Sequence, residues 1–150
     1  MKLKKLTLTT FILFSLLPFD LFAAKGIRIG VIYPLSGNFA AAGRQLRAGA
    51  ELAAEIANKS MNLNMSMAKS QGIARMDGAQ IKLIFKDHEA NPTLGADLAK
   101  KLVLDDKVDG LMGCYHSSVT KTVSAVAEQY GVPMINGTST LVRRTARPRH

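Results

Sequence analysis

Cysteine, tryptophan and long apolar runs are scarce in this chain, and each scarcity excludes a class of protein. The sequence of 150 residues contains one cysteine, Cys114, and no tryptophan. A single thiol excludes an intrachain disulfide framework. Because Cys114 ends an apolar stretch, we expect it to be a small buried side chain rather than a nucleophile. The one long apolar run, Leu6 to Phe19, is shorter than the roughly 20 residues of a membrane-spanning helix.

Positive charge is plentiful but is not concentrated in the body of the chain. The formal net charge is +9, from 20 Lys and Arg against 11 Asp and Glu, and aromatic residues make up only 6%. Part of the excess lies at the two ends, in Lys2, Lys4, Lys5 and an arginine-rich stretch over residues 143–149. No basic helix face with interleaved aromatic residues is present, so we predict that the protein does not bind nucleic acid.

The N-terminal residues have the pattern of an export signal. Three lysines precede the apolar run, which is followed by the small residues Ala23 and Ala24. A basic head, an apolar core and small residues at the cleavage position predict a secretory signal peptide over residues 1–24, and hence a periplasmic location. No cysteine lies near the cleavage position, so we do not expect a lipid anchor.

Residues 25–140 alternate between strand-like and helix-like segments. Short β-branched apolar runs predict strands over residues 27–33, 80–86, 108–113 and 132–135. Apolar residues at helical spacing predict helices over residues 41–58, 93–105 and 117–130, the second of them capped by Thr93. Strand–helix–strand repetition with short turns predicts an α/β fold, a parallel sheet with flanking helices.

Residues 59–79 interrupt this alternation and are rich in methionine. The segment carries Met61, Met65, Met67 and Met76. Thioether sulfurs can hold Cu(I), whereas methionines in a loop or helix extension more often pack against the body of a protein. The segment has no cysteine or histidine, which favours packing. We therefore predict no metal site and no cofactor.

Two clusters of hydroxyl side chains follow the ends of predicted neighbouring strands. One is Tyr115-His116-Ser117-Ser118 and the other is the stretch 136–140, which holds Thr138, Ser139 and Thr140. Ser117 and Ser118 lie at the first turn of a predicted helix, where they serve either as a simple cap or as donors to an anion. The second cluster favours a shared ligand site, because the carboxyl ends of parallel strands meet at one edge of the sheet.

Four motifs together resemble those of a known family. They are the stretches 29–37, 87–92, 113–118 and 131–139, in this order. The resemblance is to the periplasmic substrate-binding proteins of branched-chain amino-acid-type ABC transporters, and it covers about residues 26–140. It implies that the chain is no enzyme, that it adopts a class I periplasmic-binding fold, and that its partner is an ABC transporter membrane permease.

The same resemblance implies roles for several residues. Ser117 and Thr140 match the residues that bind the carboxylate of the ligand, and the backbone carbonyl of Thr138 matches the acceptor for its ammonium group. Phe39 is the nearest aromatic residue for the wall that contacts the ligand side chain. Tyr115 and Ser118 belong to the same hydroxyl cluster and are added as candidates.

The C-terminal residues depart from the family pattern. The resemblance implies two lobes, whereas residues 25–140 account only for part of the first, and residues 141–150 form a basic, out-of-pattern tail. We expect a premature stop or a frameshift, and weak binding at such a half-site. The fourth strand is then expected to be an unprotected edge.

Three alternatives remain open. The stretch 113–115 also resembles the amide- and urea-binding branch of the same family. An α/β enzyme is disfavoured because the sequence has no Gly-x-Ser-x-Gly, phosphate-binding or dinucleotide-binding loop, and Asp87-His88-Glu89 is better explained as a polar turn. A receptor sensor domain is disfavoured by the predicted signal peptide and by the lack of a DNA-binding or spanning segment.

Overall fold

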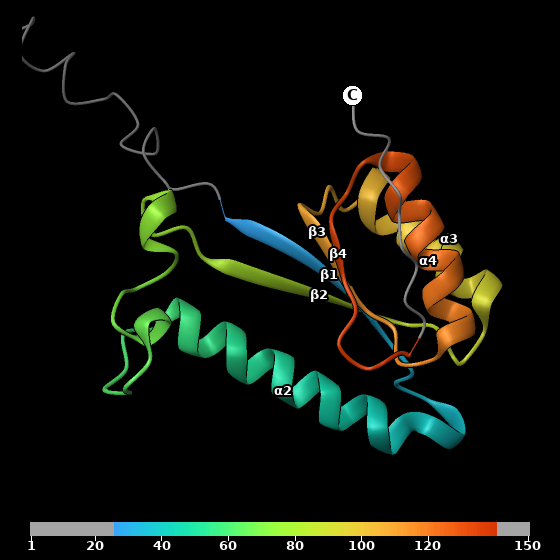
Figure 1. The fold of residues 1–150 in the computed structure, drawn as a ribbon, viewed down its shortest axis with the longest axis horizontal. Coiled ribbons are helices and arrows are strands. Elements are labelled where there is room, and N and C mark those ends of the chain that lie inside the picture. The colour runs from blue at the N-terminus through green and yellow to red at the C-terminus, as the bar shows by residue number, and fades with distance from the viewer. Residues whose placement is uncertain (1–25, 141–150) are drawn as a thin grey trace, which may run out of the picture.

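A four-stranded parallel sheet organises the computed structural model, which describes residues 26–140 (Figure 1). The strands have the order β2-β1-β3-β4 and are β1 (Ile27–Tyr33), β2 (Ile81–Asp87), β3 (Gly110–Gly113) and β4 (Met134–Ile135). The helices are α2 (Ala40–Asn58), α3 (Pro92–Leu104) and α4 (Ser117–Tyr130). The predicted α/β fold with a parallel sheet and flanking helices is therefore confirmed.

The apolar core lies between one face of the sheet and helices α3 and α4. The β-branched and leucine side chains of the two layers interdigitate there, and ten buried residues form one cluster: Ile32, Ala99, Leu102, Val108, Leu111, Cys114, Val119, Val123, Val126 and Ala127. The central strand β1 pairs with β2 along its whole length and with β3 from Ile29 to Ile32. Since all strands are parallel, this core fixes their carboxyl ends at one edge.

The helix boundaries follow local capping chemistry, with one correction to the prediction. Helix α3 is capped by Asn91, whose side-chain oxygen accepts hydrogen bonds from the backbone nitrogens of Thr93 (2.9 Å) and Leu94 (3.1 Å). Thr93 is thus inside the helix and the prediction that it is the cap is wrong. Pro92 explains the shift, because proline is pre-set for the first helical position and lacks the N–H that would need a partner there.

Residues 59–79 form a loop with two short 3-10 turns, η4 (Ser66–Ala68) and η5 (Ala74–Met76). Met65, Met67 and Met76 are about half exposed. Met67 nevertheless lies against the body of the protein, beside α2 and the sheet, so the prediction of packing is correct for Met67, whereas Met65 and Met76 are only loosely packed. One isolated antiparallel bridge, in which the backbone nitrogen of Ile73 donates to the Ala79 carbonyl at 3.0 Å, closes the end of the loop, so the shape of the loop depends on backbone pairing more than on methionine burial.

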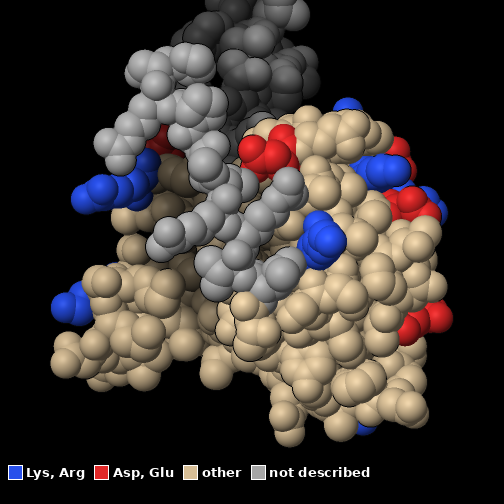
Figure 2. Space-filling view, turned by 45° about the vertical axis from the view of Figure 1, so that its right-hand side comes forward, with Lys and Arg blue, Asp and Glu red and all other residues tan. Residues whose placement is uncertain are grey.

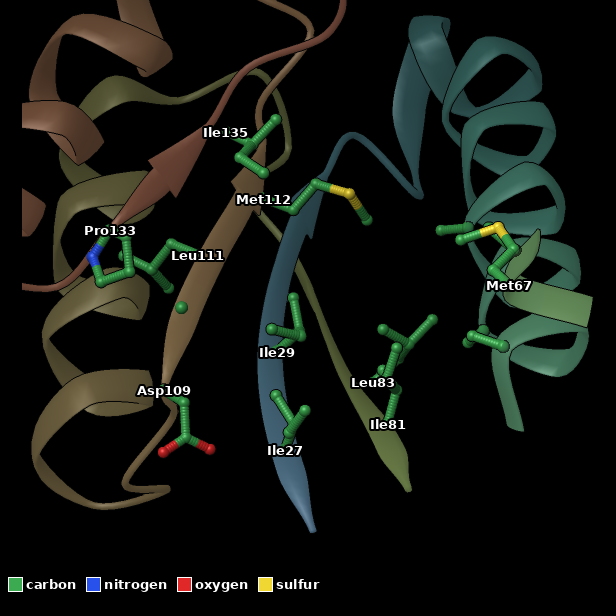
Figure 3. Close-up of a pocket in the computed structure, with 15 residues that line it drawn as sticks. Ile27, Ile29, Met67, Ile81, Leu83, Asp109, Leu111, Met112, Pro133 and Ile135 are labelled. Carbon is green, nitrogen blue, oxygen red and sulfur yellow. The ribbon is translucent and has the colours of Figure 1, made fainter. Parts of the chain in front are cut away.

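The second face of the sheet is covered incompletely. Within residues 26–140, α2 is the helix on this side (Figure 1). An apolar groove of about 360 Å³ runs between α2 and the sheet (Figure 3). We call this the α2 groove; side chains that line it include Ile27, Ile29, Leu83, Met112, Met67 and Ile135. Strand β4, at the border of the groove, pairs only with β3 among the described strands, and Ile135 is 71% exposed.

Candidate ligand-binding site

Three hydroxyl groups from two loops meet at the carboxyl edge of the sheet. The Oγ of Ser117, in the first turn of α4, lies 3.5 Å from the Oγ1 of Thr140, which follows β4. The Oγ of Ser139 lies 3.3 Å from the same Ser117 oxygen. We call Ser117, Ser139 and Thr140 the hydroxyl site. The two hydroxyl clusters recognised in the sequence are therefore brought together in the structure.

Asn136 gives the loop after β4 its shape. Its side-chain oxygen accepts hydrogen bonds from the backbone nitrogens of Ser139 (3.1 Å) and Thr138 (3.4 Å), and its side-chain nitrogen donates to the Ser139 carbonyl (3.0 Å). Such an Asx turn lets a short loop hold its conformation without burial. Sequence reasoning did not give Asn136 a role, although an Asn-Gly pair after a strand was the available signal.

The start of α4 adds a favourable field for an anion. Its N-cap is His116, whose side chain makes no capping hydrogen bond, and the first turn has no acidic residue. The partial positive charge of a helix N-terminus is therefore not neutralised by a local carboxylate. Since Ser117 is the first residue of the helix, its hydroxyl lies where backbone N–H groups also point outward.

Aromatic side chains border the hydroxyl site on the side of β1. Phe39, at the end of the 3-10 turn η3 (Gly37–Phe39), lies with its ring centroid 6.1 Å from Tyr115 and 4.5 Å from His116. Tyr115 has a φ of 87°, which is rare for a residue with a side chain. The chain thus carries a strained residue two positions before Ser117, and Phe39, still 44% exposed, offers an apolar surface there.

Ser118 and Thr138, the other two hydroxyl residues predicted to bind the ligand, lie outside the hydroxyl site. The side chains of Ser118 and Thr138 are exposed and make no hydrogen bond within the described chain. The backbone nitrogen of Thr138 donates to Asn136, which leaves its carbonyl oxygen as the group of interest. The structure therefore joins Ser117, Ser139 and Thr140, and includes neither Ser118 nor the Thr138 hydroxyl in that contact.

Two histidines adjoin these aromatic rings: His116 contacts Phe39 and Tyr115, and the His88 ring centroid lies 5.4 Å from that of His116. His88 is fully buried, with Nε2 2.8 Å from the Cys114 carbonyl and Nδ1 accepting from the Ala90 backbone nitrogen at 3.0 Å. These contacts require a neutral ring protonated on Nε2. The ring nitrogens of His116, in contrast, are buried without a hydrogen-bond partner.

Asp87 and Cys114 are structural groups beside the site. The Asp87 carboxylate accepts hydrogen bonds from the backbone nitrogens of Leu35 and Glu89, both at 2.9 Å. Burial acts to raise the pKa of Asp87, but these bonds and one from Ser36 lower it overall. Burial raises the pKa of the Cys114 thiol to about 12, so it stays protonated and a nucleophilic role is excluded.

Charge and metal-binding groups do not suggest another kind of site. On the face drawn in Figure 2, basic and acidic side chains are intermixed along the upper and right-hand margins, and a broad uncharged area lies below them. In residues 26–140, no group of three or more His, Cys, Asp or Glu is placed to hold a metal ion. No helix in this range is long and apolar enough to cross a membrane.

Comparisons with known proteins agree with this geometry. The profile of a family described as periplasmic binding protein matches residues 26–150. Leu/Ile/Val-binding protein homolog 3 of Brucella melitensis is 34% identical over 125 residues, which are 83% of this chain and 30% of that protein. Leu/Ile/Val-binding protein BraC3 of Rhizobium johnstonii is 34% identical over 98% of this chain and 35% of its own length. The chain therefore spans about a third of these curated relatives.

A solved structure shows the same fold. The branched-chain amino acid transporter substrate-binding protein LivJ of Streptococcus pneumoniae, in complex with isoleucine, superposes with a TM-score of 0.63 at 29% identity. The match covers 78% of this chain and 30% of LivJ. The leucine-binding protein LivK of Thermotoga maritima has a TM-score of 0.62 at 24% identity, which compares the folds alone.

Proposed function

Because this chain belongs to the periplasmic binding protein family, we propose that it is a solute-binding protein that delivers a small amino acid of the branched-chain type to an ABC transporter. The family binds solutes outside the cytoplasm and is not a family of enzymes, as the sequence predicted. The identity of the ligand and the membrane permease as partner are both part of this proposal. The observation that carries it is the convergence of Ser117, Ser139 and Thr140.

The hydroxyl site suits the carboxylate of an amino acid. The hydroxyls of Ser117 and Thr140 donate to it, and the N-terminus of α4 adds its dipole. The carbonyl of Thr138 accepts from the ammonium group. Phe39 and Tyr115 contact the ligand side chain, since they form the apolar border beside the hydroxyls. Ser118, which is exposed, contributes at most through its backbone in this arrangement.

The expected affinity of the described lobe alone is low. Each hydrogen bond to a charged group contributes about 1.5–3 kcal/mol, whereas association costs an estimated 4–15 kcal/mol in lost motion. Two or three such bonds barely exceed this cost, so we expect dissociation constants of about 1 mM or weaker. The relatives are about three times as long, which supports a site completed by a further lobe.

The domain assignment is part of this proposal. We assign residues 1–24 to a cleaved signal peptide that directs the protein to the periplasm, residues 25–140 to part of the N-terminal lobe, and residues 141–150 to a basic tail. The first and last of these segments lie outside the described residues. The family supports a location outside the cytoplasm, and protein sequencing of the exported chain tests the cleavage position.

Ligand-observed NMR on the full chain tests the proposed function, because it detects millimolar binding. We expect L-leucine and L-isoleucine to show saturation transfer that Ser117→Ala and Thr140→Ala each reduce by about tenfold in affinity, the effect of one lost charged hydrogen bond. Ser124→Ala, on the same helix but bonded only to the Lys121 carbonyl, is the matched control. Competition by acetamide or urea, with no effect of leucine, would instead indicate the amide-binding branch.

A further inference from the structure

His116 lies at the point where the hydroxyl site meets the aromatic border. It is the N-cap of α4 and directly precedes Ser117. Its ring stands edge-on to Phe39 (4.5 Å between centroids), Tyr115 (5.0 Å) and His88 (5.4 Å). These rings come from three separate loops, so the position of His116 is fixed by long-range packing.

The ring nitrogens of His116 are unusual because they are buried and unpaired. Neither Nδ1 nor Nε2 has a hydrogen-bond partner in the described chain. A buried polar atom without a partner destabilises the folded chain, and such atoms need an explanation where they occur. The neighbouring His88 shows that the fold can satisfy an imidazole, since both of its nitrogens are bonded.

The surroundings of His116 favour the neutral form of its ring in the ligand-free chain. Burial lowers the pKa of His116 below its ordinary value of 6.5. The titratable groups around it are His88, which its own contacts keep neutral, the Tyr115 phenol, and the protonated Cys114 thiol. Asp87 is not among the causes that shift the pKa of His116.

We infer that binding of a carboxylate ligand at the hydroxyl site is coupled to the uptake of one proton from solvent by His116. The inference rests on the proposed function and concerns the regulation of the same site. A carboxylate bound at Ser117 brings a full negative charge to the residue that directly follows His116, whose ring nitrogens have no hydrogen-bond partner in the described chain. Since opposite charges at short range favour each other, the ligand stabilises the imidazolium form of His116.

The sign of the pH effect follows from this coupling. Ligand binding raises the pKa of His116, so affinity increases as the pH falls through the raised value. One unit of pKa corresponds to a tenfold change in affinity. We expect the dissociation constant for L-leucine to fall by about three- to tenfold between about pH 8 and pH 5.5, a pKa rise of about 0.5–1 on binding.

NMR titration of the histidine ring signals in the full chain tests the coupling directly. The His116 signal is identified by its loss in His116→Phe, a variant that keeps an aromatic ring against Phe39 and Tyr115 but cannot be protonated. The pKa is measured with and without L-leucine, and leucine affinity is measured at both ends of the pH range. The His116→Phe variant should bind leucine with no pH dependence. His116→Gln, which keeps a hydrogen-bonding group, is the second variant if the first does not fold.

The outcomes separate this inference from the proposed function. A rise in the His116 pKa with leucine, and loss of the pH dependence in either variant, support the coupling. If leucine shifts the backbone signals of Ser117 and Thr140 while the His116 pKa stays constant, the coupling is wrong and the proposed function stands. If leucine shifts neither, the proposed function fails and the coupling fails with it.

Discussion

The hydroxyl site and the α2 groove lie on one sheet and differ in almost every property. The hydroxyl site is small and polar, and its loop is held by the Asn136 side chain. The α2 groove is large and lined almost wholly by apolar side chains, with Met112 and Ile135 directed into it (Figure 3). The comparison teaches that the size of a concavity is a poor guide to ligand recognition, because recognition of an amino acid needs placed polar groups.

The largest effect we predict concerns the wall of the α2 groove. A Cβ added to Gly43, in the first turns of α2, would lie 1.8 Å from the Pro34 carbonyl oxygen. Gly43→Ala therefore forces the helix away from the end of β1, and we expect a loss of about 3 kcal/mol or more in the free energy of unfolding. Gly49→Ala is the control on the same helix, since its Cβ would meet nothing within 4 Å. Urea denaturation should show this variant as stable as the original or more so.

Asp87 connects the ends of β1 and β2 at the edge that carries the hydroxyl site. Asp87→Asn removes a charged acceptor for two backbone N–H groups, and we expect a loss of about 1–3 kcal/mol at neutral pH. Because the folded-state pKa is lowered, this contribution is present above the ordinary value of 3.8 and disappears as the pH falls through the folded value. Thermal unfolding should thus show a smaller difference between the two chains at about pH 3 than at pH 7. If the difference in stability between the two chains were the same at both pH values, the stabilising role given to the ionised Asp87 carboxylate would be wrong.

Asn136 tests whether the hydroxyl site depends on its loop. Asn136→Ala removes the hydrogen bonds that shape residues 136–139, so the hydroxyl of Thr140 loses its fixed position. We expect about tenfold weaker binding of L-leucine with a loss of only about 1 kcal/mol in stability. Asn64→Ala, in the exposed loop before η4, serves as the control in the same ligand-observed NMR assay. Equal binding by both variants would show that the loop conformation is not required.

The smallest effect on stability is expected at the border of the α2 groove. Ile135→Lys changes a side chain that is 71% exposed, so the free energy of unfolding should change by less than about 0.5 kcal/mol. The same change should reduce binding of a hydrophobic dye, because Ile135 lines the groove. Leu104→Lys alters an exposed leucine on α3, away from the groove, and should leave dye binding unchanged. An equal loss of dye binding in both variants would show that the dye binds outside the α2 groove.

The secondary structure was predictable where periodicity and chain breaks agree. The strand Ile27–Tyr33 and the helix Ser117–Tyr130 have the predicted bounds, the latter because Gly131 ends it in a left-handed conformation. The cap of α3 was mispredicted because Pro92 changes which residue enters the helix first. Strand β4 is shorter than expected, since only Met134 and Ile135 pair with β3.

The candidate site was predictable only in part. The meeting of Ser117 and Thr140 follows from the adjacency of β3 and β4, which the sequence implies through their order and short connection. The contacts of His116 with Phe39 and His88 join loops that are distant in the sequence, so no local sequence pattern predicts them. The α2 groove likewise depends on how far a helix stands from the sheet, which periodicity does not determine.

Mapping of backbone NMR shifts in the full chain during titration with L-leucine tests the central claim most directly. The account predicts that the largest shifts occur at Ser117, Ser139 and Thr140, with small changes at Ile29, Ala54 and Met112 in the α2 groove. Shifts confined to the groove residues, with Ser117 and Thr140 unchanged up to the highest leucine concentration, would contradict it.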